Sequence, residues 1–461
     1  MTHATCPLSS RQQTRNMLLF AANASLIFLG GSVLYVGITE AALCQKYGTS
    51  AAVANLPATA FGLGSLLPVF VAWYFPYVRL LKPILVVCYG LAAVAGLIMT
   101  ALLVTLSPAW LVVAGLVAYG LIVGGAMQLI GSFQLEALGR GMSERRRAQT
   151  LWLAYGLGPV VALVGSLVSQ MVLAGQLELP YVDSSLEFGL ARFEITSFPF
   201  PLNFAVLFAA SVPMMALCAL NSAFFVIPYP IEDLKRQPFM TGIFGGVREI
   251  LRNPTIRMAA LATVLIFAGN MILSNISLYT QQLLGTAADQ YVGYQNALRF
   301  GGKIVSGFLI GWLLTATNPK SGLTATALIG MVGVLWALVV PGKWFMVSFG
   351  LMGAGELFAM YYANYILSCS PPSKMRRNMA FTYMLPLVAS PAGWLFGKIS
   401  DGYQQDHRPS FVVAMLILAA TLALVVVALP AQPRPRREDM DATDLLLLAQ
   451  APTSVPVCPE A

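Results

Sequence analysis

Three ionisable residues lie deep inside apolar stretches of the chain: Arg299, Lys303 and Glu356. At the helical rise per residue, Arg299 lies about 12 Å, and Lys303 and Glu356 about 18 Å, from the ends of their stretches. A charge this deep in a bilayer costs at least about 2.5–3.5 kcal/mol, so it usually faces the protein interior and is paired. Arg299 and Glu356 are the expected pair. Lys303 follows Arg299 by one helical turn, where two cations repel, and one acid leaves an excess positive charge.

This imbalance predicts a site for an anionic group. We expect Arg299 and Lys303 to attract a carboxylate, a phosphate or a similar group. Glu356 would pair with them in the empty site, or carry a coupling proton during the cycle. The alternative is a structural charge cluster that holds two helices together.

Other polar residues follow single faces of the apolar stretches, at helical spacing. The stretch at 257–284 places Asn270 and Ser274 on one face, and the next stretch places Gln295 on the face of Arg299. A hydrogen bond between packed helices is the alternative for any one of them. With residues from the second and fourth stretches, the expected substrate-binding residues are Arg299, Lys303, Glu356, Asn270, Ser274, Gln295, Gln128 and Asn55.

Apolar helices must position these residues. The 461 residues are 57% hydrophobic and 10% charged, with a mean hydropathy of +0.74, whereas soluble domains carry about 25% charged residues. A helix needs about 20 apolar residues to cross a bilayer. Twelve stretches are predicted as such helices: 17–39, 51–75, 83–106, 109–133, 149–174, 201–227, 257–284, 291–315, 321–341, 344–368, 378–400 and 410–429.

The twelve stretches divide into two sets of six. A shift of 232 residues aligns the fifth stretch with the eleventh, and both enter from the same side, which is typical of parallel repeats. The shift superposes Arg145 on Arg377, Thr150 on Thr382, Pro159 on Pro391 and Gly165 on Gly397. We therefore expect an all-α polytopic membrane protein with twelve transmembrane helices in two pseudo-symmetric six-helix bundles. Its expected parts are a tail at 1–16, a bundle at 17–227, a linker at 228–256, a bundle at 257–430 and a disordered tail at 431–461.

The basic residues indicate how the helices are oriented. Most of the 27 Lys and Arg residues fall in the N-terminal region, the even-numbered connections and the C-terminal tail. The positive-inside rule then places both termini in the cytoplasm. The net charge of +8 is explained by this topology, so we expect a lipid bilayer and no nucleic acid as partner. The expected location is the plasma membrane, the inner membrane of a bacterium.

Metal and cofactor chemistry is not expected. The six cysteines are scattered, and the two histidines, His3 and His407, lie at the periphery, which disfavours a metal or haem site. No catalytic Ser/His/Asp pattern or nucleotide-binding loop is visible, so we do not expect an enzyme. Glu40 and Asp401 fall near the outer ends of their stretches. We expect them to be gate pairs or solvated caps, with Lys398 as a partner for Asp401.

The twelve stretches, the linker after the sixth and the segment from Glu136 to Gly165 resemble the major facilitator superfamily of secondary transporters. Within that segment, Gly158-Pro159 is similar to the antiporter motif of the superfamily. The resemblance implies two halves that rock around a central site, with Glu136 facing basic loops at the cytoplasmic gate. The residues expected to serve gating or structural roles are Glu136, Arg145, Pro159, Arg377 and Pro391.

Two features depart from the superfamily pattern. The connections at 76–82 and 315–320 lack the aspartate of its loop signature, and the fourth stretch lacks the buried arginine of many proton-coupled members. We expect a secondary active transporter that moves a small solute with an anionic or zwitterionic group by alternating access. It is expected to be a monomer and to use a coupling ion, proton or sodium. The alternative is a transport-fold sensor, receptor or scaffold that binds a ligand without translocating it.

Overall fold

The structure is a computed structural model. It describes residues 8–228, 247, 252–370, 378 and 381–433, apart from 76, 140–141, 183–187 and 197. Most of the expected linker and both tail ends lie outside these residues.

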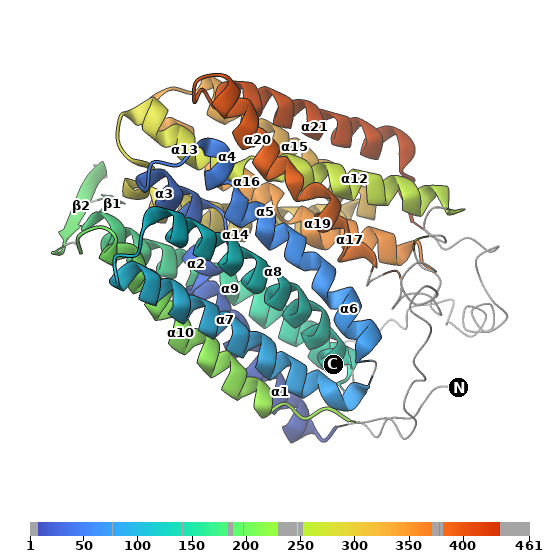
Figure 1. The fold of residues 1–461 in the computed structure, drawn as a ribbon. Helices are drawn as coiled ribbons and strands as arrows, with labels where there is room; N and C mark the ends of the chain where they lie inside the picture. The colour runs from blue at the N-terminus through green and yellow to red at the C-terminus, as the bar shows by residue number, and fades with distance from the viewer. Residues whose placement is uncertain are drawn as a thin grey trace.

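The first half of the chain forms six membrane crossings, several of them built from consecutive short helices. Helices of this half gather on one side of the molecule, in blue and green in Figure 1. The crossings are α1 (Ser10–Leu29), α2 (Gly31–Leu34) and α3 (Ile38–Lys46); α4 (Ala51–Ala54), α5 (Leu56–Leu63), η1 (Gly64–Leu66) and α6 (Leu67–Tyr74); η2 (Val78–Leu80) and α7 (Leu81–Val104); α8 (Ala109–Gly139); α9 (Glu144–Ala174); and α10 (Leu202–Ala223).

The second half repeats this arrangement on the other side, in yellow to red in Figure 1. Its elements are α12 (Pro254–Asn270) and α13 (Leu273–Leu284); η3 (Ala288–Gln290) and α14 (Val292–Ala316); α15 (Pro319–Val339); η4 (Gly342–Met346), α16 (Val347–Gly355) and α17 (Phe358–Ser368); α19 (Leu385–Ala389) and α20 (Pro391–Gly402); and α21 (Arg408–Ala428).

Ten helices of the described chain are long and apolar enough to cross a membrane. The first and eleventh crossings make up the rest of the twelve. The first is interrupted at Gly30 and again at 35–37, and the eleventh is interrupted at Ser390, between α19 and α20. All three interruptions lie inside apolar runs that the sequence pattern alone represents as unbroken helices.

The two glycines that the repeat superposes both stand where helices touch through their backbones. A Cβ atom on Gly165 of α9 would lie 2.4 Å from the carbonyl oxygen of Leu29, and one on Gly397 of α20 would lie 2.5 Å from Cα of Ala52. Neither position has room for a side chain, which explains why glycine stands at both. The sequence shift of 232 residues therefore links two close helix contacts.

The two repeat-related prolines have different local structures. Pro159 lies inside α9, a helix of 31 residues that continues on both sides of the proline. Pro391 instead begins α20, after α19 has ended at Ala389. Inside α9 a proline removes one backbone hydrogen bond, whereas at the first position of α20 the N–H would have no partner within the helix in any case. Sequence similarity at these positions does not extend to identical geometry.

The connection between α9 and α10 contains a β-hairpin. Strands β1 (Gln176–Val182) and β2 (Phe188–Glu194) pair antiparallel, with Gln176 opposite Glu194. Arg192 lies 2.9 Å from the carboxylate of Glu194. The all-helical expectation therefore holds for the crossings but not for this outer segment.

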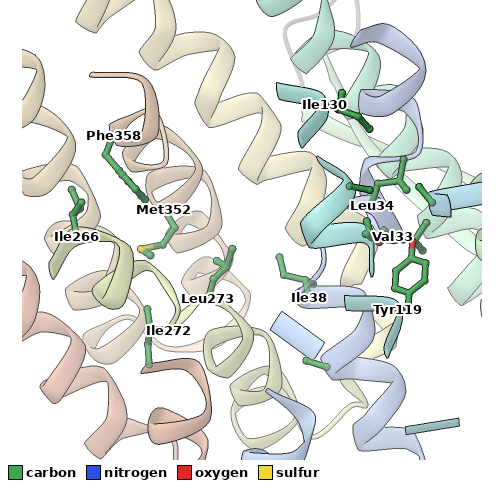
Figure 2. Packing of buried hydrophobic residues seen from close by; sticks show 14 of the residues in the cluster. Val33, Leu34, Ile38, Tyr119, Ile130, Ile266, Ile272, Leu273, Met352 and Phe358 are labelled. Carbon is green, nitrogen blue, oxygen red and sulfur yellow. Dashed lines mark hydrogen bonds between the residues drawn. The ribbon is translucent and has the colours of Figure 1, made fainter. Parts of the chain in front are cut away.

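Buried apolar side chains fill the interior of both halves. Figure 2 shows Ile38 and Tyr119 of the first half, with Leu273 and Met352 of the second. All four are buried. The charged residues therefore stand in a largely apolar protein of low dielectric constant.

Helices α14 and α16 touch through their backbones at the level of the charged residues. A Cβ on Gly353 would lie 1.9 Å from the carbonyl oxygen of Arg299, whereas one on Gly350 would meet nothing nearer than 3.5 Å. We expect Gly353→Ala to destabilise the protein by about 1–3 kcal/mol, the usual cost of inserting a methyl group into a filled contact. Thermal melting of the detergent-purified protein measures this. Gly350→Ala, one turn away, is the control and should melt like the wild type; equal melting of all three proteins would contradict the close contact.

Candidate functional site

The three buried charges form one cluster. Glu356 accepts from Arg299 Nε at 2.7 Å through Oε1 and lies 2.5 Å from Lys303 Nζ through Oε2. All three side chains are about nine-tenths buried, with exposed fractions of 11%, 12% and 8% for Arg299, Lys303 and Glu356. Each carboxylate oxygen thus has its own cation, and the cluster carries one positive charge more than it has negative charges.

Local helix geometry brings this cluster together. Arg299 and Lys303 lie on the same face of α14 because they are four residues apart. Glu356 lies where α16 ends and before α17 begins, with its N–H still bonded to the carbonyl of Met352. The glycine contact between α14 and α16 places this turn beside both cations.

Aromatic rings cover the cations from both halves of the protein. Lys303 Nζ lies 5.4 Å from the ring centre of Tyr35 and 5.0 Å from that of Phe300. The Arg299 guanidinium lies 6.0 Å from the ring centre of Phe300. Tyr35, in the break between α2 and α3, and Phe28 of α1 both contact Phe300. The first half therefore contributes an aromatic ring, Tyr35, to the charged cluster, and the second contributes Phe300 and all three charges. Such contacts favour a cation by about 0.5–2 kcal/mol.

A cavity of about 390 Å³ lies between the halves and includes the charged cluster in its wall. It extends toward the ends of α1 and α8 that lie on the side of the chain termini, reaching Phe20 and Gln134. Among the residues expected to bind a substrate, Arg299, Lys303, Glu356, Gln128, Asn270 and Ser274 line it. Most of the remaining wall is apolar or aromatic, including Phe28, Phe61, Phe267, Met271 and Phe358.

Two of the expected binding residues lie elsewhere. Gln295 hydrogen-bonds Ser277 and Thr280 inside the second half, at 2.6 and 2.8 Å. Asn55 donates to Asn275 across the two halves at 2.6 Å. Neither residue is part of the cavity wall. Both instead hold helices together, which is the packing alternative that their sequence pattern left open.

The expected cytoplasmic gate falls largely outside what can be described. Glu136 lies on α8 and Arg145 on the first turn of α9, but the placement of the Arg145 side chain is not described. Arg377 lies outside the described residues. The pairing of Glu136 with basic loops therefore stays a prediction.

The face of the molecule opposite the termini, which we call the outer face, is closed by contacts between the halves. Asp401, at the end of α20, accepts hydrogen bonds from the backbone N–H groups of Ala51 and Ala52, at 2.9 and 3.1 Å. These are the first residues of α4, so the carboxylate of one half caps a helix of the other, where negative charge is favoured. Lys398 was the expected partner of Asp401, but its ammonium instead lies 5.7 Å from the Trp394 ring centre.

The repeat-related helix provides a matching contact. Gln170, near the end of α9, accepts from the N–H groups of Gly293 and Tyr294 at the start of α14, at 3.0 and 3.3 Å. A third contact joins Lys46 of α3 to Asp289 of η3 at 3.1 Å. We refer to the contacts of Asp401, Gln170 and Lys46 as the outer closure. Sequence reasoning missed Gln170 because a glutamine near a helix end carries no distinguishing signal.

Glu40 is fully buried rather than placed at the outer rim. It lies on α3, and its exposed fraction is 0%. Its Oε2 accepts from the N–H of Gly37 at 2.7 Å, and its Oε1 has no hydrogen-bond partner among the described residues. Its position near the end of a stretch suggested solvent contact, but α3 is covered by α13 and α14 of the other half.

Comparison with known proteins relates this architecture to solved transporters. The nucleoside transporter NupG is 12% identical over 90% of this chain and 98% of its own, with a TM-score of 0.62. The fucose:proton symporter FucP of E. coli is 15% identical, over 90% and 99%, with a TM-score of 0.58. A bacterial homologue of the human lysosomal transporter Spinster is 14% identical, over 91% and 98%, with a TM-score of 0.60. No family model matches the chain, and no curated protein matches it by sequence.

These similarities establish the fold. The chain is an integral membrane protein with the major facilitator fold, twelve helices in two six-helix bundles. The expectation from sequence is thereby confirmed at the level of architecture. At identities of 10–16%, the solute and the roles of individual residues do not carry over.

The outer closure should weaken when Asp401 is removed. Hydrogen bonds to a charged group contribute about 1.5–3 kcal/mol, so Asp401→Ala should raise the fraction of open molecules by about tenfold or more. Cys44, buried in α3, is a native reporter, and its labelling by a membrane-impermeant maleimide should accelerate accordingly.

Asp406→Ala is the matched control for this experiment. Asp406 accepts from Gln282 within the second half, so its loss leaves the contact between the halves intact. A Cys44→Ala variant shows which part of the maleimide labelling comes from Cys44. Equal labelling rates in Asp401→Ala and the wild type would show that this contact does not hold the outer face closed.

Proposed function

We propose that the protein is a secondary active transporter of amphipathic organic anions. The observation that carries this proposal is the charge of the cavity wall, where Arg299 and Lys303 share the single carboxylate of Glu356. The neighbours NupG and FucP are named a nucleoside transporter and a proton symporter, which supports transport as the general activity.

Charge balance explains why an anion would bind here. A buried cation without a full counter-charge is costly in a medium of low dielectric constant. A carboxylate, sulfonate or phosphate group beside Lys303 would supply the missing negative charge and the missing hydrogen-bond acceptor. Gln128, Asn270 and Ser274 add neutral hydrogen-bonding groups on the same wall. An anionic group therefore gains more from this site than a neutral or cationic one does.

The rest of the wall favours an apolar body attached to the anion. Phe28, Phe61, Phe267 and Phe358 all line the cavity. Burying apolar ligand surface against such residues contributes about 25 cal/mol per Å², and flat rings stack on aromatic faces. The volume of about 390 Å³ limits the solute to a small molecule. Inorganic anions would satisfy the charge but leave the apolar wall unused.

Transport requires that the cavity open alternately to each side. The outer closure separates the cavity from the outer face, and its three contacts consist of hydrogen bonds and one ion pair that can break and re-form. We propose that both termini lie in the cytoplasm of a cell whose plasma membrane holds the protein, that it works as a monomer, and that a coupling ion drives it.

Benzenesulfonate is a suitable probe because its permanent charge prevents passive diffusion across lipid. We expect liposomes containing the protein to exchange labelled benzenesulfonate, and Lys303→Gln to lower its affinity by at least about tenfold, since one desolvated charge contact is worth about 1.5–3 kcal/mol. Lys398→Gln removes a lysine outside the cavity wall and should behave like the wild type. An equal loss in both variants would point to a general charge effect instead.

The same liposomes distinguish transport from ligand sensing. Thermal stabilisation of the protein by benzenesulfonate without any flux would favour the sensor or scaffold. Neither stabilisation nor flux with benzenesulfonate, benzoate or phenyl phosphate would contradict an organic-anion site altogether.

A further inference from the structure

Glu40 is a second acid in the interior, and it has no cation of its own. Within the described chain, its Oε1 has neither a hydrogen-bond nor an ion-pair partner, and the residue is fully buried. Its other oxygen is used by the N–H of Gly37, which caps the start of α3. Lys46, on the same helix, is already paired with Asp289.

An ionised carboxylate in this position would raise the free energy of the folded protein. One backbone N–H offsets only part of the lost hydration, and the effective penalty for a buried, unpaired charge is several kcal/mol. Protonation removes the charge. It also turns Oε1 into a hydroxyl while Oε2 keeps its bond to Gly37. The geometry therefore suits a neutral carboxylic acid.

Glu40 lies near the charged cluster and at similar depth. It precedes Lys46 by six residues and so lies about 9 Å below the outer closure, while Arg299 lies about 10 Å from the outer end of α14. The titratable groups around Glu40 are Arg299 on α14, Tyr119 on α8 and Cys44 on its own helix. Arg299 is the one permanent charge among them.

Counting charges links Glu40 to the anion site. Arg299 and Lys303 supply two positive charges, and Glu356 supplies one negative charge. If Glu40 is ionised, the four residues together are neutral and the attraction for an anion weakens. If Glu40 is protonated, the set carries one positive charge and an anion restores neutrality. A proton on Glu40 and an anion in the cavity therefore favour each other.

We propose that Glu40 is the proton-binding site of this transporter and that one proton is bound there with each monovalent anion. This inference rests on the proposed function. It assigns the proton to the first half of the chain, whereas the sequence suggested Glu356, whose two oxygens are both engaged by cations. Because α3 belongs to the outer closure through Lys46, opening of the outer face would expose Glu40 to water and let it gain or release its proton there.

The protonation of Glu40 can be tested without any substrate. Infrared difference spectra of the purified protein near neutral pH should contain a carboxylic C=O stretching band that shifts in heavy water. The band should be lost in Glu40→Gln and retained in Glu178→Gln, which alters a partly exposed acid of the outer hairpin. Identical spectra of Glu40→Gln and the wild type in this region would overturn the proposal.

Coupling is tested in liposomes with benzenesulfonate as the probe. An inwardly directed proton gradient should accelerate uptake by the wild type and by Glu178→Gln. Glu40→Gln should lose this acceleration but keep benzenesulfonate exchange without a gradient, because a neutral amide mimics the protonated acid. Glu40→Asp, which keeps a carboxyl group, should recover part of it. An undiminished response in Glu40→Gln would overturn the proposal.

The two experiments separate this inference from the proposed function. Absence of wild-type exchange would count against anion transport, while the infrared band still decides the state of Glu40. The histidine that the structure describes does not confuse the pH dependence. Burial lowers the pKa of His407, in the connection between α20 and α21, to about 4, so it is neutral between about pH 5 and pH 8.

Discussion

The shared carboxylate of Glu356 is the interaction on which the interior depends. Two cations on one helix face repel each other, and in an apolar interior neither can remain without a counter-charge. Glu356 reaches both because a helix break presents it to α14 and because Gly353 allows the two backbones to touch. The aromatic rings of Tyr35 and Phe300 also lie against the cations, at 5.0–6.0 Å from their ring centres.

At the outer face, a side chain of each half binds the N-terminus of a helix in the other half. Asp401 of the second half binds the start of α4, and Gln170 of the first half binds the start of α14. Each half is therefore held by hydrogen bonds from the N–H groups at the start of a helix. Helix N-termini carry unsatisfied N–H groups and a partial positive charge, so they readily donate hydrogen bonds to such carboxylate and amide oxygens. The difference between a charged Asp401 and a neutral Gln170 makes the two contacts unequal in strength. Releasing the outer closure costs hydrogen bonds and an ion pair, which can break and re-form as the face opens.

Helix α3 contributes both to the outer closure and to the surroundings of the proposed binding sites. The short α3 carries Lys46, which joins the closure, and Glu40, which we propose carries the proton. Just before α3, Tyr35 covers Lys303. A movement of α3 would therefore alter the outer face, the proton site and the cover of the anion site together. Because the first crossing is interrupted at 35–37, α3 can move relative to α1 and α2, which a continuous helix would not allow.

The amino-acid pattern alone was enough to predict the membrane class, the twelve crossings and the three buried charges. Apolar runs of about 20 residues have few other uses, and an ionisable residue inside one stands out against them. The repeat between α9 and α20 could also be predicted, because close helix contacts require glycine. Which polar residues face the cavity could be learned only from the fold. Gln128 and Gln295 carry similar patterns, yet one lines the cavity and the other bonds Ser277 and Thr280. The burial of Glu40 and the capping of α4 by Asp401 likewise follow from the fold, because both depend on a surface of the other half. Asp401 lies 350 residues from Ala51 in the sequence. Helical spacing defines the face of a residue, but not what packs against that face.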